Sequence, residues 1–436
     1  MRTPAWKPTR GHGDTARGVV FFLIVSVLVA DPSTAGAQPP PAAVVVDRDL
    51  TVAAGTTDVL ALQRALASLE DELLPTHFSE ATRLTHALGI GYRLGKWLAL
   101  DLPQDWFLMV VAHEVFGHGA RLREIGASDV TYSFDAPPPY RGGGGSTMFD
   151  ENVLIVATRA DVLGIDAAGI EAQNVLADTI GRQAVAGGAL SYRDAWLYFQ
   201  SRVAGLQYIQ SVTPQSPPGH DVRDFLLDFN AGCQPPVCVP LTATSLKRRS
   251  LLMLGDPVLA YSAYGFAVSY LVQGRAVAAV PMIPLPHDVR YLPAVAFAMT
   301  PYGTEWTTEH NLRVGERLTR ISLRFGDAGV SRPWGAGVVA TRVARVGPVV
   351  ADVSADFWRQ PPLDAPPSSP ALTAGGLAAI TARAALGGQG SSGRLGITTQ
   401  VGYKSAGFVP GERLRSGAIV RAGLTVALDR SSQTGS

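Results

Sequence analysis

The last third of the chain alternates between apolar and polar residues. A period of two is the pattern of β-strands, and it restricts this part of the chain to β folds. Residues 351–357 read ADVSADF, in which alanine, valine and phenylalanine alternate with aspartate and serine. The segments 317–325, 395–403 and 420–428 follow the same rule. Successive side chains of a strand point to opposite faces, so the pattern predicts about seven or eight strands with one apolar and one polar face. We predict an antiparallel β domain over residues 289–428 and a polar tail at 429–436.

A helical domain is predicted ahead of the strands, over residues 56–285, because apolar residues there recur every three to four positions. The fold class is therefore α+β, with a helical domain followed by a β-rich one. The longest apolar stretch, Leu251 to Gln273, contains Asp256 and Pro257. It is a buried core helix, an interfacial segment or a membrane-spanning segment.

The N-terminus has the pattern of a cleavable export signal. Basic residues up to Arg17 precede the uncharged run VVFFLIVSVLVA at 19–30 and the small triplet Ala-Gly-Ala at 35–37. The run is short for a spanning helix, which needs about 20 residues. We predict a signal peptide at 1–37 and a linker at 38–55, an uncleaved anchor being the alternative. Export also favours a local disulfide between Cys233 and Cys238.

Export and alternating strands together resemble the pattern of a small outer-membrane β-barrel of about eight strands, in which alternate residues face lipid and lumen. A soluble sandwich explains the alternation equally well, and the polar end DRSSQTGS lacks the terminal aromatic residue of such barrels. The resemblance implies an exported protein of the outer membrane or periplasm that contacts the membrane through its C-terminal strands.

The overall charge argues against a nucleic-acid partner. Lysine and arginine number 37 against 36 aspartates and glutamates, a formal net charge of +1. Such a chain has no basic field with which to displace the counterions of nucleic acid.

One motif carries chemistry: His113, Glu114 and His118, in the sequence HEVFGH after an apolar segment. Two imidazoles can bind Zn²⁺, and the carboxylate can act as general base toward a zinc-bound water. The usual four-residue spacing between the histidines returns them to one helical face, whereas the spacing here is five. On a regular helix the two rings would lie about 140° apart, so the motif requires a turn widened to the π type. Gly117 stands where that distortion is least costly.

The six-residue form His-Glu-x-x-Gly-His resembles the zinc motif of the dipeptidyl-peptidase III family. The resemblance implies one Zn²⁺ ion held by His113, His118 and a glutamate about fifty residues on, for which Glu171 in GIEAQN is the candidate. Glu114 would activate water for the hydrolysis of a peptide or protein substrate. The nearby Asp161, Asp166 and Asp178 are competing third ligands. The match is confined to one motif and one candidate ligand.

The segment HEVFGHGARL is also similar to the metal-binding helix of site-2 intramembrane proteases, which keep the four-residue spacing and take an aspartate as third ligand. Asp256 is the only remote substitute for that aspartate. His220 and Asp221, in PPGHDVRD, are candidates for a pair that supports the site or stabilises the transition state, or for a solvent loop. The loop 135–145, stiff and then glycine-rich, is expected to border a cleft.

The sequence thus predicts an exported zinc metallopeptidase, a hydrolase of the cell envelope. Two alternatives stay open: a non-enzymatic outer-membrane barrel or envelope protein with a structural metal, and a site-2-like protease.

Overall fold

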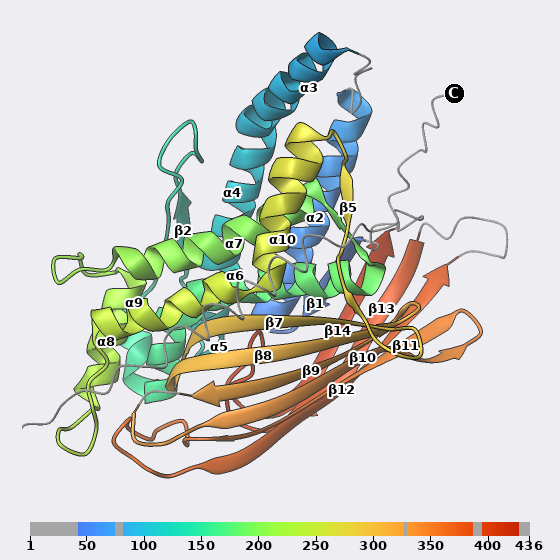
Figure 1. The fold of residues 1–436 in the computed structure, drawn as a ribbon. Coiled ribbons are helices and arrows are strands. Elements are labelled where there is room, and N and C mark those ends of the chain that lie inside the picture. Colours follow the sequence, from blue (N-terminus) through green and yellow to red (C-terminus); the bar gives the residue numbers. More distant parts are fainter. Residues whose placement is uncertain (1–41, 75–81, 327–328, 387–394, 427–436) are drawn as a thin grey trace, which may run out of the picture.

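Helices lie on one face of a ten-stranded antiparallel sheet (Figure 1). The computed structural model describes residues 42–74, 82–326, 329–386 and 395–426. The predicted signal peptide and polar tail lie outside these residues. The α+β class predicted from the sequence is confirmed.

The sheet is a meander of consecutive antiparallel neighbours. Its long strands are β7 (Val289–Thr300), β8 (Gly303–Val314), β9 (Arg317–Gly326), β10 (Trp334–Val346), β11 (Val349–Gln360), β12 (Thr373–Leu386), β13 (Leu395–Lys404) and β14 (Gly417–Val426). The short strand β6 (Ile283–Pro284) pairs with β7 at one edge, and β1 (Ala42–Asp47) pairs with β14 at the other. Within the described residues these two edge strands do not pair with each other, so the sheet is open. In place of the strand pairing that would close a barrel, helix α2 (Val52–Leu73) contacts the edge strand β1, and helix α6 (Arg159–Gly187) contacts β7, the long strand next to the other edge.

The described part of the segment predicted as a linker, residues 42–55, belongs to the fold, which corrects that prediction for these residues. It contains β1 and the start of α2 (Val52–Leu73). The sequence of β1 is AAVVVD, which lacks the alternation of apolar and polar residues that predicted the other strands. Its edge position is fixed from both sides, because the Val45 amide donates to Asp58 of α2 at 2.6 Å while the strand pairs with β14.

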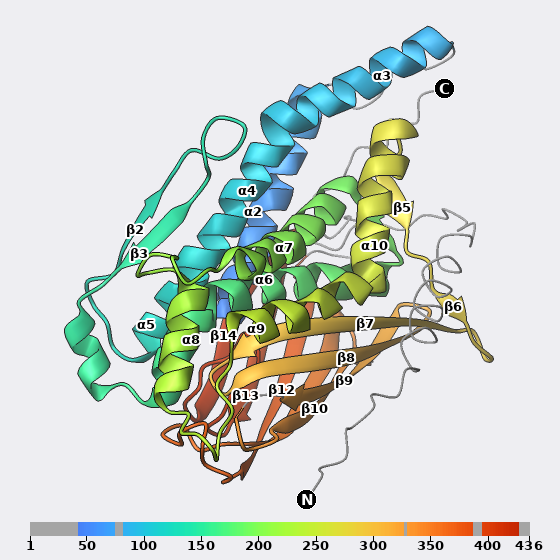
Figure 2. The same cartoon turned by 60° about the vertical axis from the view of Figure 1, so that its left-hand side comes forward.

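A helix without interruption runs from Arg83 to Glu124 and carries the HEVFGH motif. It is built from α3 (Arg83–Lys96), the π segment η1 (Trp97–Asp101), α4 (Leu102–Val111), the π segment η2 (Ala112–His118) and α5 (Gly119–Glu124). The hairpin of β2 (Thr131–Phe134) and β3 (Gly145–Met148) follows it and lies beside it (Figure 2).

The central helix α6 (Arg159–Gly187) contacts η2, α2, α7 (Tyr192–Ser211), α8 (Asp221–Ala231) and β7. Thr158 caps its N-terminus in a reciprocal pair with Asp161. Many of its buried residues are alanine or glycine, which lets its neighbours approach closely. The remaining elements of the helical layer are η3 (Glu151–Val156), β4 (Ala189–Ser191), α9 (Ala243–Ser250), η4 (Leu251–Gly255), α10 (Pro257–Tyr264), η5 (Gly265–Val272) and β5 (Val277–Ala279).

The structure also bears on the predicted disulfide and on the predicted membrane-spanning segment. Cys233 and Cys238 form the predicted disulfide, with Cα atoms 5.2 Å apart. Among the described residues no single helix has the length and apolar composition to cross a membrane, although the bent pair Ala243–Gly255 and Pro257–Val272, at 62°, passes that test jointly.

Candidate metal centre

The turn that carries the two histidines is a π-helix, as the five-residue spacing requires. The segment η2 spans Ala112–His118, and the Gly119 amide donates to the Glu114 carbonyl, five residues back. Gly117 lets this turn pack closely against α6, because a Cβ there would lie 2.7 Å from the Ala168 carbonyl oxygen. The extra residue per turn brings His113 and His118 to the same side of the helix.

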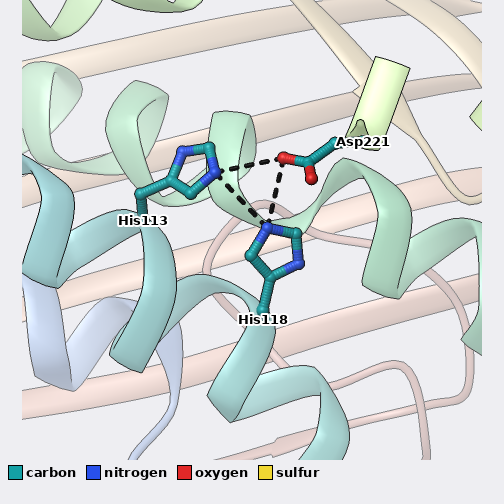
Figure 3. A group of neighbouring side chains, drawn as sticks. All are labelled: His113, His118 and Asp221. Atoms are coloured by element: carbon teal, nitrogen blue, oxygen red, sulfur yellow. Dashed lines mark hydrogen bonds and ion pairs between the residues drawn. The ribbon is translucent and has the colours of Figure 1, made fainter. Parts of the chain in front are cut away.

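Three ligand atoms converge at this turn (Figure 3). Nε2 of His113 and Nε2 of His118 lie 3.3 Å apart, and Asp221 Oδ2 lies 3.1 Å from the first and 3.2 Å from the second. A tetrahedral zinc ion with bonds of about 2.0–2.1 Å separates its ligand atoms by roughly 3.3 Å. The two nitrogens and the oxygen therefore form a triangle of the size that a metal ion needs.

Contacts behind the imidazoles fix their orientation. Nδ1 of His118 lies 2.8 Å from the Ile165 carbonyl oxygen of α6 and can only donate there, which leaves the Nε2 lone pair facing the other two ligand atoms. The His113 ring packs on Gly169, where a Cβ would lie 2.2 Å from two ring atoms. Its other neighbour is Tyr208 of α7, with ring centroids 6.0 Å apart.

Asp221 reaches the site from the first turn of α8, and its amide donates to the Tyr208 hydroxyl at 3.3 Å. Its neighbour His220 points elsewhere and stacks on the same tyrosine, with centroids 4.4 Å apart. Of the predicted His220–Asp221 pair, one residue therefore belongs to the ligand group and the other supports Tyr208.

The charges of the group favour a cation between the three side chains. Burial alone would raise the pKa of the Asp221 carboxyl, but the two imidazoles hold it well below its usual range. Burial alone would lower the pKa of His118, but the Asp221 carboxylate, with a smaller contribution from Glu114, raises it to about 9. In the absence of metal, a proton on His118 balances the buried Asp221 carboxylate, and a bound cation would supply positive charge in its place.

Glu114 is buried beside the group and held by the β2–β3 hairpin. The Thr147 hydroxyl of β3 donates to Glu114 Oε2 at 2.7 Å. Gly145 leaves the space for the carboxylate, since a Cβ there would lie 2.7 Å from Glu114 Cγ. The loop between the two strands is fastened to α4, where Trp106 Nε1 donates to the Gly143 carbonyl at 2.6 Å. The loop predicted to border a cleft is thus part of a hairpin that contacts the candidate general base.

Glu171, the third ligand predicted from the sequence, serves another purpose. Arg121 binds both of its carboxylate oxygens, with Nη2 at 2.6 Å from Oε1 and 2.7 Å from Oε2. The amide of Gly411 donates to the same carboxylate at 2.9 Å. The side chain lies on the part of α6 that faces α5, and Asp221 occupies the place expected for it in the ligand group.

The other acidic candidates also have separate environments. Asp161 caps α6, Asp178 pairs with Arg320 and Arg182, and Asp256 caps α10 and accepts from the Tyr198 hydroxyl. Asp166 is the acidic candidate whose pKa is affected by the site itself. Burial first, and then the neighbouring carboxylates of Asp228 and Asp221, raise its pKa to about 9. Asp166 is therefore neutral near pH 7 and is a poor ligand in its present surroundings.

Replacing Gly169 with alanine is expected to weaken metal binding by about 10- to 100-fold, the range found when a contact that orients a metal ligand is lost. The new methyl group would displace the His113 ring. Gly164→Ala on the same helix is the matched control, because a Cβ there comes no closer than 3.3 Å, to the tip of Leu414, and meets Pro301 at an ordinary contact distance of 3.6 Å. Competition with a chromophoric zinc chelator measures both affinities, and equal affinities would contradict the proposed position of His113.

Comparisons with protein-family models, with curated proteins and with solved structures found no match to this chain.

Proposed function

We propose that the protein is a zinc-dependent hydrolase of peptide bonds that works in the cell envelope after export. The observation that carries the proposal is the group in Figure 3, in which two imidazole nitrogens and one carboxylate oxygen lie 3.1–3.3 Å apart. The residue next to His113 in the chain, Glu114, is buried. Two histidines with one carboxylate form a common ligand set of catalytic zinc.

The choice of a catalytic over a structural metal rests on the number of ligands. Structural zinc sites are closed by four protein ligands, whereas catalytic sites use three and leave a position for water. Among the described residues the group contains three: His113, His118 and Asp221. The general base that a hydrolase needs is the residue next to the first histidine.

Each residue then has a role in hydrolysis. His113, His118 and Asp221 bind the ion, which when present acts as a Lewis acid and lowers the pKa of a coordinated water to about 7. Glu114 accepts a proton from the attacking water while the oxygen of that water bonds to the peptide carbonyl carbon. When the C–N bond breaks, Glu114 returns that proton to the leaving amine.

Each of the two family resemblances accounts for a different part of this site. The six-residue motif with its widened turn is what the dipeptidyl-peptidase III resemblance implies, and an aspartate as third ligand is what the site-2 resemblance implies. Asp221 lies in a GHD sequence at a helix N-terminus, a different setting from the motif of the site-2 proteases. The proposal therefore extends to the reaction class and not to the substrate of either family.

Metal analysis tests the proposal directly. We expect the purified protein to contain about one zinc ion per chain, and we expect hydrolysis of a fluorogenic peptide library to stop on chelation and return on zinc addition. Protein without bound zinc, or with peptide hydrolysis that survives complete chelation, would overturn it.

A further inference from the structure

The sheet turns its charged face toward the helices, the reverse of the usual arrangement of a sheet covered on one face. Arg320 of β9 pairs with Asp178 of α6 and with Glu309 of β8, and Arg324 pairs with Asp356 of β11 at 3.2 Å. The other buried charged or amide side chains on this face include Glu305, Asn311, Asp352, Lys404 and Arg421.

On the opposite face, strands β11 to β14 carry apolar, aromatic, small and threonine side chains, with Arg359 near the end of β11 as the charged exception among the described residues. The side chains of this face alternate along each strand with the buried set. From Val349 to Phe357 of β11, and in the described parts of β12 to β14, none of them is charged. The large exposed ones on this face of β9 to β14 are Ile321, Phe325, Trp334, Val338, Val346, Val349, Phe357, Ile380, Leu386, Leu395, Ile397, Val401, Tyr403, Val420, Leu424 and Val426. We call this set the outer face. Ile380, Val401 and Val420, adjacent in register at its centre, are 57%, 61% and 62% exposed.

The two ends of the outer face differ. Near the loops beside α8 it ends in aromatic side chains, Phe325, Trp334, Phe357 and Tyr403, which are 38–60% exposed. At the other end the hairpins carry exposed arginines, among them Arg290, Arg317, Arg342 and Arg345. Aromatic and basic residues that border an apolar band are typical of surfaces that meet the headgroup region of a membrane.

The curvature of the sheet decides between lipid and a second copy of the chain. Figure 2 shows the strands curving around the helical layer, so that the outer face is convex. Two rigid convex faces touch over a narrow strip and would leave most of these side chains in water. Fluid acyl chains fit a convex surface over its whole extent. An apolar surface of this size left in water would favour aggregation.

We propose that the outer face of the sheet contacts the acyl chains of a lipid bilayer, with the helices and the metal centre on its other side. This inference rests on the sheet alone and stands independently of the hydrolase proposal. Because Gly411 in the loop between β13 and β14 donates to Glu171, the aromatic end of the face is the end nearest the metal centre. The centre would then lie close to the membrane surface.

Flotation of the purified chain, signal removed, with vesicles of phosphatidylethanolamine and phosphatidylglycerol tests the proposal. We expect the protein to float with the vesicles, and to do so equally with neutral phosphatidylcholine in 1 M salt. The triple variant Ile380→Glu, Val401→Glu, Val420→Glu is expected to lower the bound fraction by at least about tenfold, because carboxylates are excluded from hydrocarbon. Leu88→Glu on α3 is the matched control, since Leu88 is 65% exposed on a helix away from the sheet.

Three outcomes would overturn the proposal. One is flotation that the triple variant leaves unchanged, and another is flotation that disappears in high salt, which would assign the contact to the arginines. The third is a dimer that forms without lipid and that the triple variant dissociates, which would assign the face to a second copy. Far-ultraviolet circular dichroism and zinc content of each variant establish that it is folded.

Discussion

Glu114→Gln is expected to lower kcat for peptide hydrolysis by about 10³-fold, within the range that general acid–base catalysis contributes. Glutamine keeps the size of the side chain and can still accept the hydrogen bond that Thr147 donates at 2.7 Å. It has no carboxylate to take a proton from water. Zinc content should be unchanged, because Glu114 is not among the three ligands.

The test of this prediction compares kcat and bound zinc in the same preparations, the metal being measured by mass spectrometry. Glu72→Gln, an exposed carboxylate on α2, is the control and should retain full activity. A Glu114→Gln protein that binds zinc and cleaves peptide at the normal rate would remove Glu114 from the mechanism.

Asp221→Asn is expected to reduce zinc affinity by more than about 10²-fold, because it removes the one anionic ligand of the group. Glu171→Gln should leave zinc affinity unchanged. It should instead lower the free energy of unfolding by about 1.5–3 kcal/mol, because the buried Arg121 guanidinium loses its hydrogen bonds to one carboxylate while it keeps Glu124, at 3.1 Å, as a charge partner. Arg121 is 3% exposed and Glu171 is 4% exposed, so solvent cannot replace the pair.

The two variants together distinguish Asp221, the candidate third ligand of the group, from Glu171, the third ligand that the dipeptidyl-peptidase III resemblance implies. Zinc affinity comes from chelator competition and stability from denaturant unfolding of the zinc-free proteins. The reverse result, with zinc lost in Glu171→Gln and retained in Asp221→Asn, would show that the metal binds elsewhere than at the group in Figure 3.

The local part of the site could be predicted from the sequence because helical geometry acts over a few residues. The five-residue spacing of His113 and His118 admits a shared metal only on a widened turn, and the structure has that turn. The third ligand lies 103 residues beyond His118, at a distance along the chain over which spacing carries no geometric information. The available signal was the sequence GHD ahead of an amphipathic helix, since an aspartate in a first helical turn often faces a cation or an amide.

The strands were predictable for the same local reason, and the closure of the sheet was not. Alternation such as that in β11 reports which side chains share a face, and it is the same in an open sheet, a sandwich and a barrel. What determines the topology here is β1, which joins the sheet from the far end of the chain through its pairing with β14 and its contact with Asp58.

The widened turn of η2 has a consequence for how this helix relates to the common four-residue zinc motif. Five residues at the wider π spacing rotate the chain by about as much as four residues of a regular helix, so α4 and α5 keep their relative orientation. Removing Val115 would leave His-Glu-Phe-Gly-His, a motif of the usual spacing. Arg121 would still point toward Glu171. The additional residue therefore changes the helix at one turn only. Deletion of a single codon would convert one form of the motif into the other.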